Sequence, residues 1–233
     1  MRKLILIITF LVGLSFTNME PARTANDNER YVFQVISFTL PGDALSGQSE
    51  LNSQVQQELM ERFQSYGPPG VVESSAGFSE RLHSAGGRFI SYPTITTRPG
   101  DLTGAELVMD PQYFEKGDDG RFELKYMDPR EAPGMSLKFV YSEMDDSRYI
   151  EFDYSLEIRV IESREQLPGV MFDVGKPIVQ KFSSDEVRNL EQGKWLLLEA
   201  YELSEKSTGK SDILMIVLKV RSEAEVRRIV AER

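Results

Sequence analysis

The sequence predicts a mainly β protein, a β-rich α+β fold. We expect an antiparallel meander of long hairpins, with a helix near the N-terminus and a short C-terminal helix. Residues 134–161 give the clearest indication, because apolar and polar residues alternate from Ile150 to Val160. Such alternation is typical of a strand with one buried and one solvated face. Residues 194–203 and 212–220 are apolar without alternation, which indicates strands that are covered on both faces.

The N-terminal residues predict an export signal. A short basic region, residues 1–3, precedes the apolar run 4–16, which is short for a membrane span and typical of a signal-peptide core. We expect residues 1–17 to be a signal peptide and residues 18–30 to be a polar spacer; an uncleaved anchor is the alternative. In a Gram-negative bacterium, export would place the remaining chain in the periplasm or the outer membrane.

Turn and helix signals divide the next part of the chain. Residues 31–40 are aromatic and β-branched and end at a Pro-Gly-Asp turn. A helix with apolar residues at helical spacing should stop at residues 67–70, Gly-Pro-Pro-Gly, because proline cannot continue it. Pro93 marks a sheet edge or a bulge. The expected elements are a strand at 31–40, a helix at 53–66, a short helix at 79–84 and a strand at 88–97.

The second part of the chain is richer in strands. Clusters of Gly, Asp and Pro, such as residues 116–120, separate short strands. Because its strands are apolar on both sides, the second long hairpin should be the most buried part of the sheet. Ser222 and Glu225 form a capping box at the start of a helix. The expected elements are strands at 102–109 and 121–126, a hairpin at 134–161, a weaker strand at 177–182, a hairpin at 194–203 and 212–220, and a helix at 222–233.

Composition excludes several classes of function. The formal net charge of -10, from 27 basic and 37 acidic residues, argues against nucleic-acid binding, which needs a basic surface. The chain has no cysteine, so disulfides, thiolate metal sites and thiol nucleophiles are excluded. A chain of 233 residues with 40% hydrophobic residues can bury one main domain.

Few residues are candidates for catalysis. His83 is the single histidine, so a triad or a histidine metal cluster would have to be built around it, yet no nucleophile elbow is present. Glu151, Asp153 and Glu157 share one strand face, which is how a glycoside hydrolase could present its acid and base. A solvated sheet face explains these three carboxylates equally well, and we favour that interpretation.

Binding motifs are equally sparse. The acidic turns at residues 118–120 and 145–146 could offer oxygens to calcium, but neither follows the pattern of a dedicated loop. Trp195 is expected in the core. No P-loop, dinucleotide fingerprint or zinc motif is present. We therefore expect no enzymatic activity, no catalytic or cofactor-binding residue, no metal site and no cofactor.

The order of the segments carries a family resemblance. Residues 89–100 read FISYPTITTRPG, and a glycine-led strand, an acidic turn and an alternating strand follow at 134–158. A Pro-x-Val strand at 177–179, a Gly-x-x-Leu-Leu-Leu strand at 193–198 and an apolar strand at 213–220 close the series. This series resembles the C-terminal core domain of bacterial secretins, the ring-forming outer-membrane channels of type II and type III secretion and type IV pilus systems. The resemblance assigns residues 31–221 to a secretin-like β domain and residues 222–233 to a C-terminal helix.

Three departures from the family pattern stand out. Glu199 and Ala200 occupy the place of a glycine pair, and Val220-Arg221-Ser222 replaces a proline-containing tail. Only the expected spacer, residues 18–30, lies between the expected signal and the first strand, so we expect no preceding ring-building domains.

The resemblance implies a non-enzymatic structural or assembly role, with protein partners that are copies of the chain in a ring or components of a secretion or pilus system. Association with the outer membrane and no contact with nucleic acid go with that role. The alternative is a monomeric periplasmic protein-binding module on the same fold without channel activity. A hydrolase would need Glu151 or Asp153 in a concave pocket.

Overall fold

A computed structural model describes residues 29–42, 53–70, 73–108, 112–165, 174–204 and 211–232. The expected signal peptide, residues 1–17, and most of the expected spacer lie outside the described residues. The helices are α1 Ser53–Ser65, α2 Ala76–Ser84 and α3 Glu223–Ala231. The strands are β1 Tyr31–Pro41, β2 Arg88–Ser91, β3 Thr94–Thr97, β4 Thr103–Val108, β5 Gln112–Lys116, β6 Phe122–Tyr126, β7 Gly134–Glu143, β8 Tyr149–Glu165, β9 Val174–Glu191, β10 Trp195–Ser204 and β11 Ser211–Ser222.

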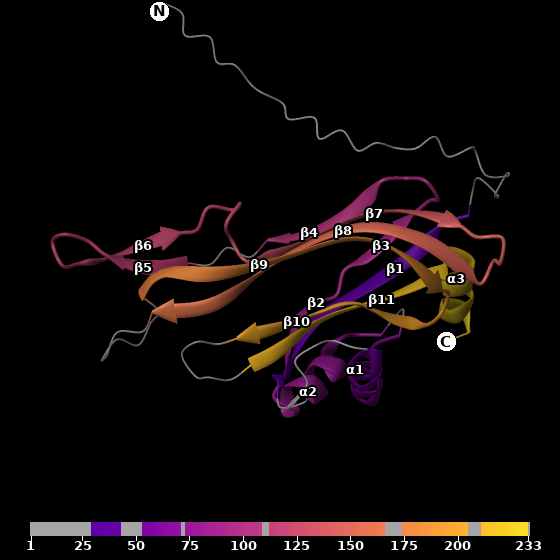
Figure 1. Ribbon diagram of the computed structural model, residues 1–233, viewed down its shortest axis with the longest axis horizontal. Helices are drawn as coiled ribbons and strands as arrows, with labels where there is room; N and C mark the ends of the chain where they lie inside the picture. The colour runs from indigo at the N-terminus through magenta and orange to yellow at the C-terminus, as the bar shows by residue number, and fades with distance from the viewer. Residues whose placement is uncertain are drawn as a thin grey trace, which may run out of the picture.

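The strands form two sheets that lie one above the other. Sheet A has the order β10-β11-β1-β2, with β3 also paired to β1, and sheet B has the order β4-β7-β8-β9-β5-β6. The pairing is antiparallel except for one parallel bridge, between Phe114 of β5 and Val174 of β9. Sheet B lies above sheet A, and α1 and α2 lie below sheet A (Figure 1). The expected mainly β, antiparallel fold is confirmed.

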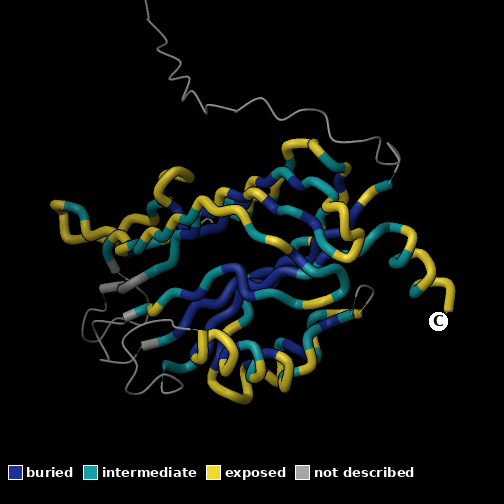
Figure 2. Tube along the Cα trace, turned by 45° about the vertical axis from the view of Figure 1, so that its right-hand side comes forward, coloured by how far each residue is buried: buried dark blue, intermediate teal, exposed yellow. Residues whose placement is uncertain are grey.

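Strands β1 and β11 are buried on both faces because sheet A is the middle layer. On β1, Tyr31, Phe33 and Val35 pack into the core between the two sheets. On the opposite face of β1, Ile36, Phe38 and Leu40 pack against the helices. Buried residues accordingly gather along the strands in the middle of the molecule (Figure 2).

The prediction for the second long hairpin was half right. Strand β11 is buried along residues 213–218, but β10 is fully buried only at Leu197, Leu198 and Ala200. Among the described strands, β10 is the last of sheet A and has a neighbour on one side only, whereas β11 lies between β10 and β1. The most buried strand pair is therefore β1 with β11.

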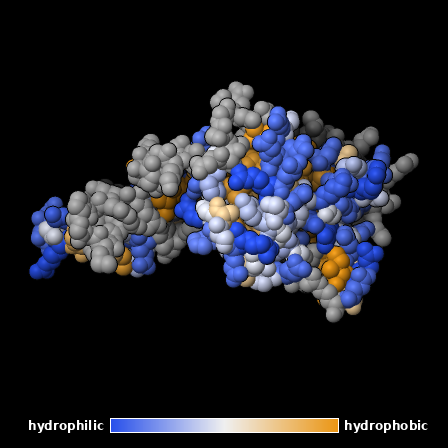
Figure 3. Space-filling model, turned by 90° about the horizontal axis from the view of Figure 1, so that it is seen from below, coloured by the Kyte–Doolittle hydropathy of each residue, from blue (hydrophilic) through white to orange (hydrophobic). Residues whose placement is uncertain are grey.

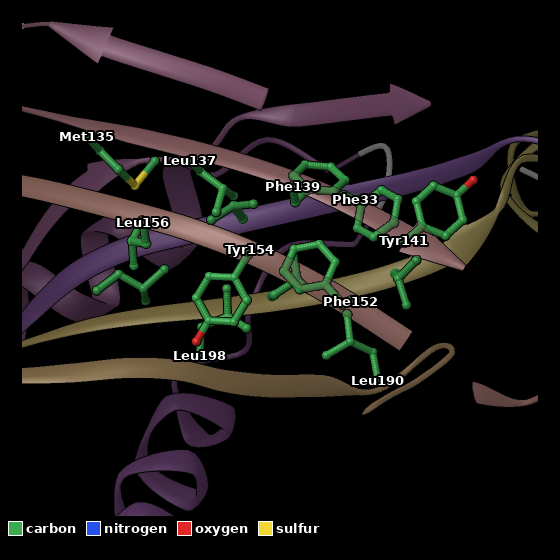
Figure 4. Packing of buried hydrophobic residues seen from close by; sticks show 14 of the residues in the cluster. Phe33, Met135, Leu137, Phe139, Tyr141, Phe152, Tyr154, Leu156, Leu190 and Leu198 are labelled. Carbon is green, nitrogen blue, oxygen red and sulfur yellow. The ribbon is translucent and has the colours of Figure 1, made fainter. Parts of the chain in front are cut away.

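The core between the sheets is largely aromatic. Phe33 of β1 lies against Phe139 of β7 and Phe152 of β8, with ring centroids 4.7 and 5.6 Å apart (Figure 4). The alternation predicted for β8 is confirmed, since Ile150, Phe152, Tyr154, Leu156 and Ile158 are buried and the residues between them are not.

The helices cover the opposite face of sheet A. Val55, Leu59 and Phe63 of α1 are buried there, together with Phe78 and Leu82 of α2. The face seen from the helix side is mostly hydrophilic, with small separate hydrophobic patches (Figure 3). Trp195, expected in the core, lies half-buried at its margin, with its ring 5.3 Å from that of Phe63.

Several boundaries differ from the predictions. The strand expected at 88–97 is broken into β2 and β3, where the Pro93 carbonyl accepts a hydrogen bond from the Val35 N–H at 3.0 Å. Helix α2 begins three residues earlier than expected, at Ala76. Strand β5 was not predicted, and β9 runs for 18 residues where a weak strand at 177–182 was expected. Strand β4 pairs with β7, so the meander holds only for β7, β8 and β9.

The C-terminal helix begins as the capping pattern predicted. The Ser222 hydroxyl accepts a hydrogen bond from the Glu225 backbone N–H at 3.2 Å, and the helix follows at once. None of its residues is buried.

The two-sided burial of β11 generates the first prediction. Ile216→Asp should lower the free energy of unfolding by about 4 kcal/mol or more, because an unpaired carboxylate would be held between the sheets. Leu197→Asp, on the helix side, should act in the same direction. Glu151→Lys, on the outer face of β8, should change the free energy of unfolding by no more than about 0.5 kcal/mol. Urea unfolding followed by circular dichroism measures all three; equal damage from Glu151→Lys would show that the faces are wrongly assigned.

A second prediction concerns alkaline pH. Burial, followed by the charges of Glu143 and Glu29, raises the pKa of Tyr31 to about 12. An unfolded chain releases this proton near pH 10. The stability conferred by protonated Tyr31, roughly 2–3 kcal/mol, is therefore fully present below pH 10 and is lost as the pH rises to about 12. Tyr31→Phe should flatten the fall in stability between pH 10 and 12, whereas Tyr126→Phe, at an exposed position, should not; an unchanged slope in Tyr31→Phe would contradict the assignment.

Candidate assembly surface

The candidate catalytic residues lie on solvated surfaces. His83 is exposed on α2, and Asp153 is exposed on the outer face of β8. The Glu157 carboxylate, on the same face, is paired with Lys181 at 2.8 Å and lies 3.5 Å from the Arg159 guanidinium. Charge pairs between neighbouring strands of this kind are common on a solvated sheet face.

The carboxylates of the two acidic turns accept hydrogen bonds from neighbouring residues of the same turns. Asp119 accepts the backbone N–H of Arg121 at 3.0 Å. The Arg148 side chain and backbone N–H hold the pKa of Asp146 down at about 2. In the described part of the chain, no group of three or more His, Asp or Glu residues is placed to hold a metal ion. Among the described helices, none is long and apolar enough to cross a membrane.

The open strand edges are the most distinctive feature of the surface. Among the described strands, β4 ends sheet B on one side, and on the other side the outer edge of β9 has a single bridge to β5, at Val174. Over the rest of β9, residues 175–191, no described strand pairs with that edge. Unpaired N–H and C=O groups along such edges are a template for another strand. In sheet A, no described strand pairs with the outer edge of β10, below β9, or with the outer edges of β2 and β3 on the opposite side.

Strand β4 is held tightly against β7 but has little protection on its outer edge. Side chains at Gly104 and Gly134 would meet the carbonyl oxygens of Leu137 and Leu107 at 2.3 and 2.2 Å, so only glycine allows this close approach. Proteins commonly guard edges with lysine, proline or a bulge. Strand β4 has none of these in residues 103–108, and it pairs with β7 in unbroken register.

The outer edge of β9 differs along its length. Its first half contains Lys176, Pro177 and Lys181, residues that discourage pairing. Its second half, residues 182–191, has neither lysine nor proline, and Val187 is 59% exposed on the outer face. Apart from the inward-pointing charges of Glu186 and Arg188, the second half of β9 is therefore the less protected part of this edge.

A polar cluster lies between the two sheets beneath this part of β9. On the inner face of β9, the Glu186 and Arg188 side chains are paired at 2.6 Å. From β10, the Glu199 carboxylate accepts a hydrogen bond from the Tyr154 hydroxyl at 2.8 Å. Burial, Glu199 and Glu186 raise the pKa of the Tyr154 and Tyr201 hydroxyls.

A bulge places Glu199 in this cluster. The register between β10 and β11 shifts between Leu197 and Glu199, so one extra residue is accommodated on β10. Bulges re-aim side chains and disturb a strand's pairing. The Glu199 carboxylate lies at the side of the molecule where, among the described strands, the outer edges of both β9 and β10 are unpaired.

The β5–β6 hairpin forms a ribbon that projects from one end of sheet B (Figure 1). Phe122, Leu124 and Tyr126 share one face of β6, and Leu124 and Tyr126 are 44% and 57% exposed. Glu123 and Lys125, on the other face, are paired at 2.7 Å. Strand β6 is thus amphipathic, with its apolar face at the surface.

The sequence contained only part of this arrangement. The alternation in β6 and the valine in β9 are visible as patterns, but which strands end a sheet is decided by the pairing of distant segments. The Leu-Leu-Leu-Glu run of β10 contains the signal that could have revealed the bulge, since the neighbouring Leu197 and Leu198 are both buried before the charged residue and so depart from regular alternation.

No family model matches the chain, and no curated protein matches it. Among solved structures, the chain is similar to the type IV competence pilus secretin PilQ of V. cholerae (10% identity, TM-score 0.34), covering 83% of this chain and 60% of that chain. It is also similar to the InvG secretin domain of the Salmonella SPI-1 injectisome (12% identity, TM-score 0.38), covering 88% and 68%. A further similar structure is the Klebsiella pneumoniae type II secretion system outer membrane complex of PulD, PulS and the PulC HR domain (9% identity, TM-score 0.38), covering 88% of this chain and 41% of that chain.

Proposed function

We propose that this chain is an exported, non-enzymatic, secretin-like subunit that assembles with copies of itself in a bacterial secretion or pilus-type envelope system, in the periplasm or at the outer membrane. The observation that carries this proposal is the pair of open edges on opposite sides of sheet B, β4 and the second half of β9. The order of secretin-like segments in the sequence supports the same role.

Edges on opposite sides favour a head-to-tail arrangement. When β4 of one copy pairs with β9 of the next, the same contact repeats, and it closes into a ring if the rotation between copies allows. Backbone hydrogen bonds then satisfy both edges. The six residues of β4 fit within residues 182–191 of β9.

The polar cluster is compatible with such a contact. A neighbouring strand on β9 would cover Glu186 and Arg188 further, and inward-pointing charges usually oppose edge pairing. Here the two charges are already paired with each other, so covering them leaves no isolated charge.

The alternative role, a monomeric protein-binding module, is favoured by a different observation. The apolar face of the β5–β6 ribbon offers exposed aromatic and aliphatic side chains for a partner protein. This role needs neither sheet edge.

Because the chain has no cysteine of its own, disulfides between introduced cysteines can test the assembly without competing thiols. The paired variant Glu106→Cys with Val187→Cys introduces one thiol on each of the two edges. If β4 meets β9 of the next copy, mild oxidation should give a ladder of covalent multimers, because the cysteines of neighbouring strands fall within disulfide reach. Moving the second cysteine to Ser183, Asp185 or Asn189 allows for the unknown register.

Two controls accompany this test. Glu106→Cys alone can form at most dimers, and pairing it with Val230→Cys, on α3 and 49% exposed, should give no ladder. Light scattering and electron microscopy of the cysteine-free protein complete the experiment. A monomer in mild detergent without heat-resistant rings would refute the assembly proposal and favour the binding module.

A further inference from the structure

A row of polar residues interrupts the helix-covered face of sheet A. Along this face the paired positions of β1 and β11 are apolar from Leu40 and Ile213 as far as Ile36 and Val217. The next pair is Gln34 with Lys219. Arg221 follows two residues further along the same face, opposite Val32.

The polar row lies at the end of the helix layer. Phe63, near the end of α1, contacts Trp195, and Trp195 is paired across β10 and β11 with Lys219. On the other side, the Gln34 side-chain amide donates to the Tyr92 hydroxyl oxygen. We call Lys219, Arg221, Gln34, Tyr92 and Trp195 the Lys219 site.

The two cations of this site are poorly compensated. The Lys219 ammonium lies over the Trp195 ring, 5.4 Å from its centroid, and none of the ion pairs among the described residues includes Lys219. Arg221, whose side chain is 17% exposed, has its Nε 3.6 Å from the Glu225 carboxylate. That Nε atom is buried and makes no hydrogen bond within the described chain.

Electrostatics at the site favour an added negative charge. Burial lowers the pKa of Lys219, and the charge of Arg221 lowers it further, while Glu225 acts in the opposite direction. Two cations on one strand face, two residues apart and partly removed from water, repel each other. A single carboxylate placed between them would offset both the repulsion and the cost of burial.

We propose that the Lys219 site binds a carboxylate side chain of an acidic, extended segment of a partner protein. A guanidinium matches the planar geometry of a carboxylate, and the Trp195 ring offers an apolar surface to the methylene groups of a glutamate. Trp195 begins β10, and no described strand pairs with its outer edge, so the backbone of the segment can add to sheet A beside the site. This binding does not depend on assembly of the chain with its own copies.

Trp195 is the only tryptophan in the chain and reports directly on Lys219. The test titrates the full chain with a hexaglutamate peptide at constant ionic strength and follows Trp195 emission. Hexaglutamine and inorganic phosphate serve as control ligands. We expect a saturable change with hexaglutamate, and with each control ligand a response at least tenfold weaker at the same concentration.

Variants assign the response to the site. Arg221→Gln and Lys219→Met should each weaken hexaglutamate binding at least tenfold, while Lys138→Met, which removes an exposed lysine from sheet B, should leave it unchanged. Circular dichroism verifies that each variant is folded, and a series of protein concentrations without peptide separates binding from self-association. The proposal is overturned if hexaglutamate gives no saturable change, if phosphate or hexaglutamine acts equally well, or if folded Arg221→Gln binds like the unaltered chain.

Discussion

Burial of β1 and β11 on both faces is the constraint on which the rest of the structure depends. Each of these strands has apolar side chains pointing both ways, so each needs two covers. Sheet B supplies one cover and the helices α1 and α2 supply the other. Neither cover closes the sides of the molecule, because stacked sheets hide each other's faces and leave their edges unpaired. The open edges at β4, β9 and β10 are therefore a direct consequence of how the core is built.

The polar groups near those edges follow the same logic. Where both faces of a strand are covered, a charge is costly, and β11 carries none from Ile213 to Leu218. Charges reappear where a cover ends, at Lys219 beyond α1 and at Glu186 and Arg188 on the open side of sheet B. A half-covered charge keeps part of its hydration and can be paired by an incoming group. Both candidate surfaces thus lie at the margins of the buried core, where the strands are covered on only part of their surface.

The sequence predicts elements well where burial is one-sided or complete. The hairpin of β7 and β8 was predicted because regular alternation has no other simple explanation, and β1 and β11 were predicted from apolar runs. The length of β9 was underestimated because its inner face includes the polar residues Ser184, Glu186 and Arg188. The sequence of β9 therefore lacks a regular alternation of apolar and polar residues. The edges could not be predicted from the sequence, since β4 pairs with β7 rather than with β5, the next strand along the chain. A lysine at the end of an apolar strand, Lys219, is visible in the sequence as a candidate binding residue. Its exposure, however, depends on where helix α1 ends, which the sequence of β11 does not show.

The two proposed surfaces should respond to salt in opposite directions. Copies with a formal charge of -10 repel one another, and screening shortens that repulsion to about 8 Å at physiological ionic strength. Pairing of β4 with β9 rests on backbone hydrogen bonds between edges, so salt removes an obstacle without weakening the contact itself. Capture of a carboxylate by Lys219 and Arg221 rests on local attraction between opposite charges, which salt weakens. If the two surfaces are independent, added salt should therefore strengthen the pairing of β4 with β9 and weaken the binding of the acidic peptide.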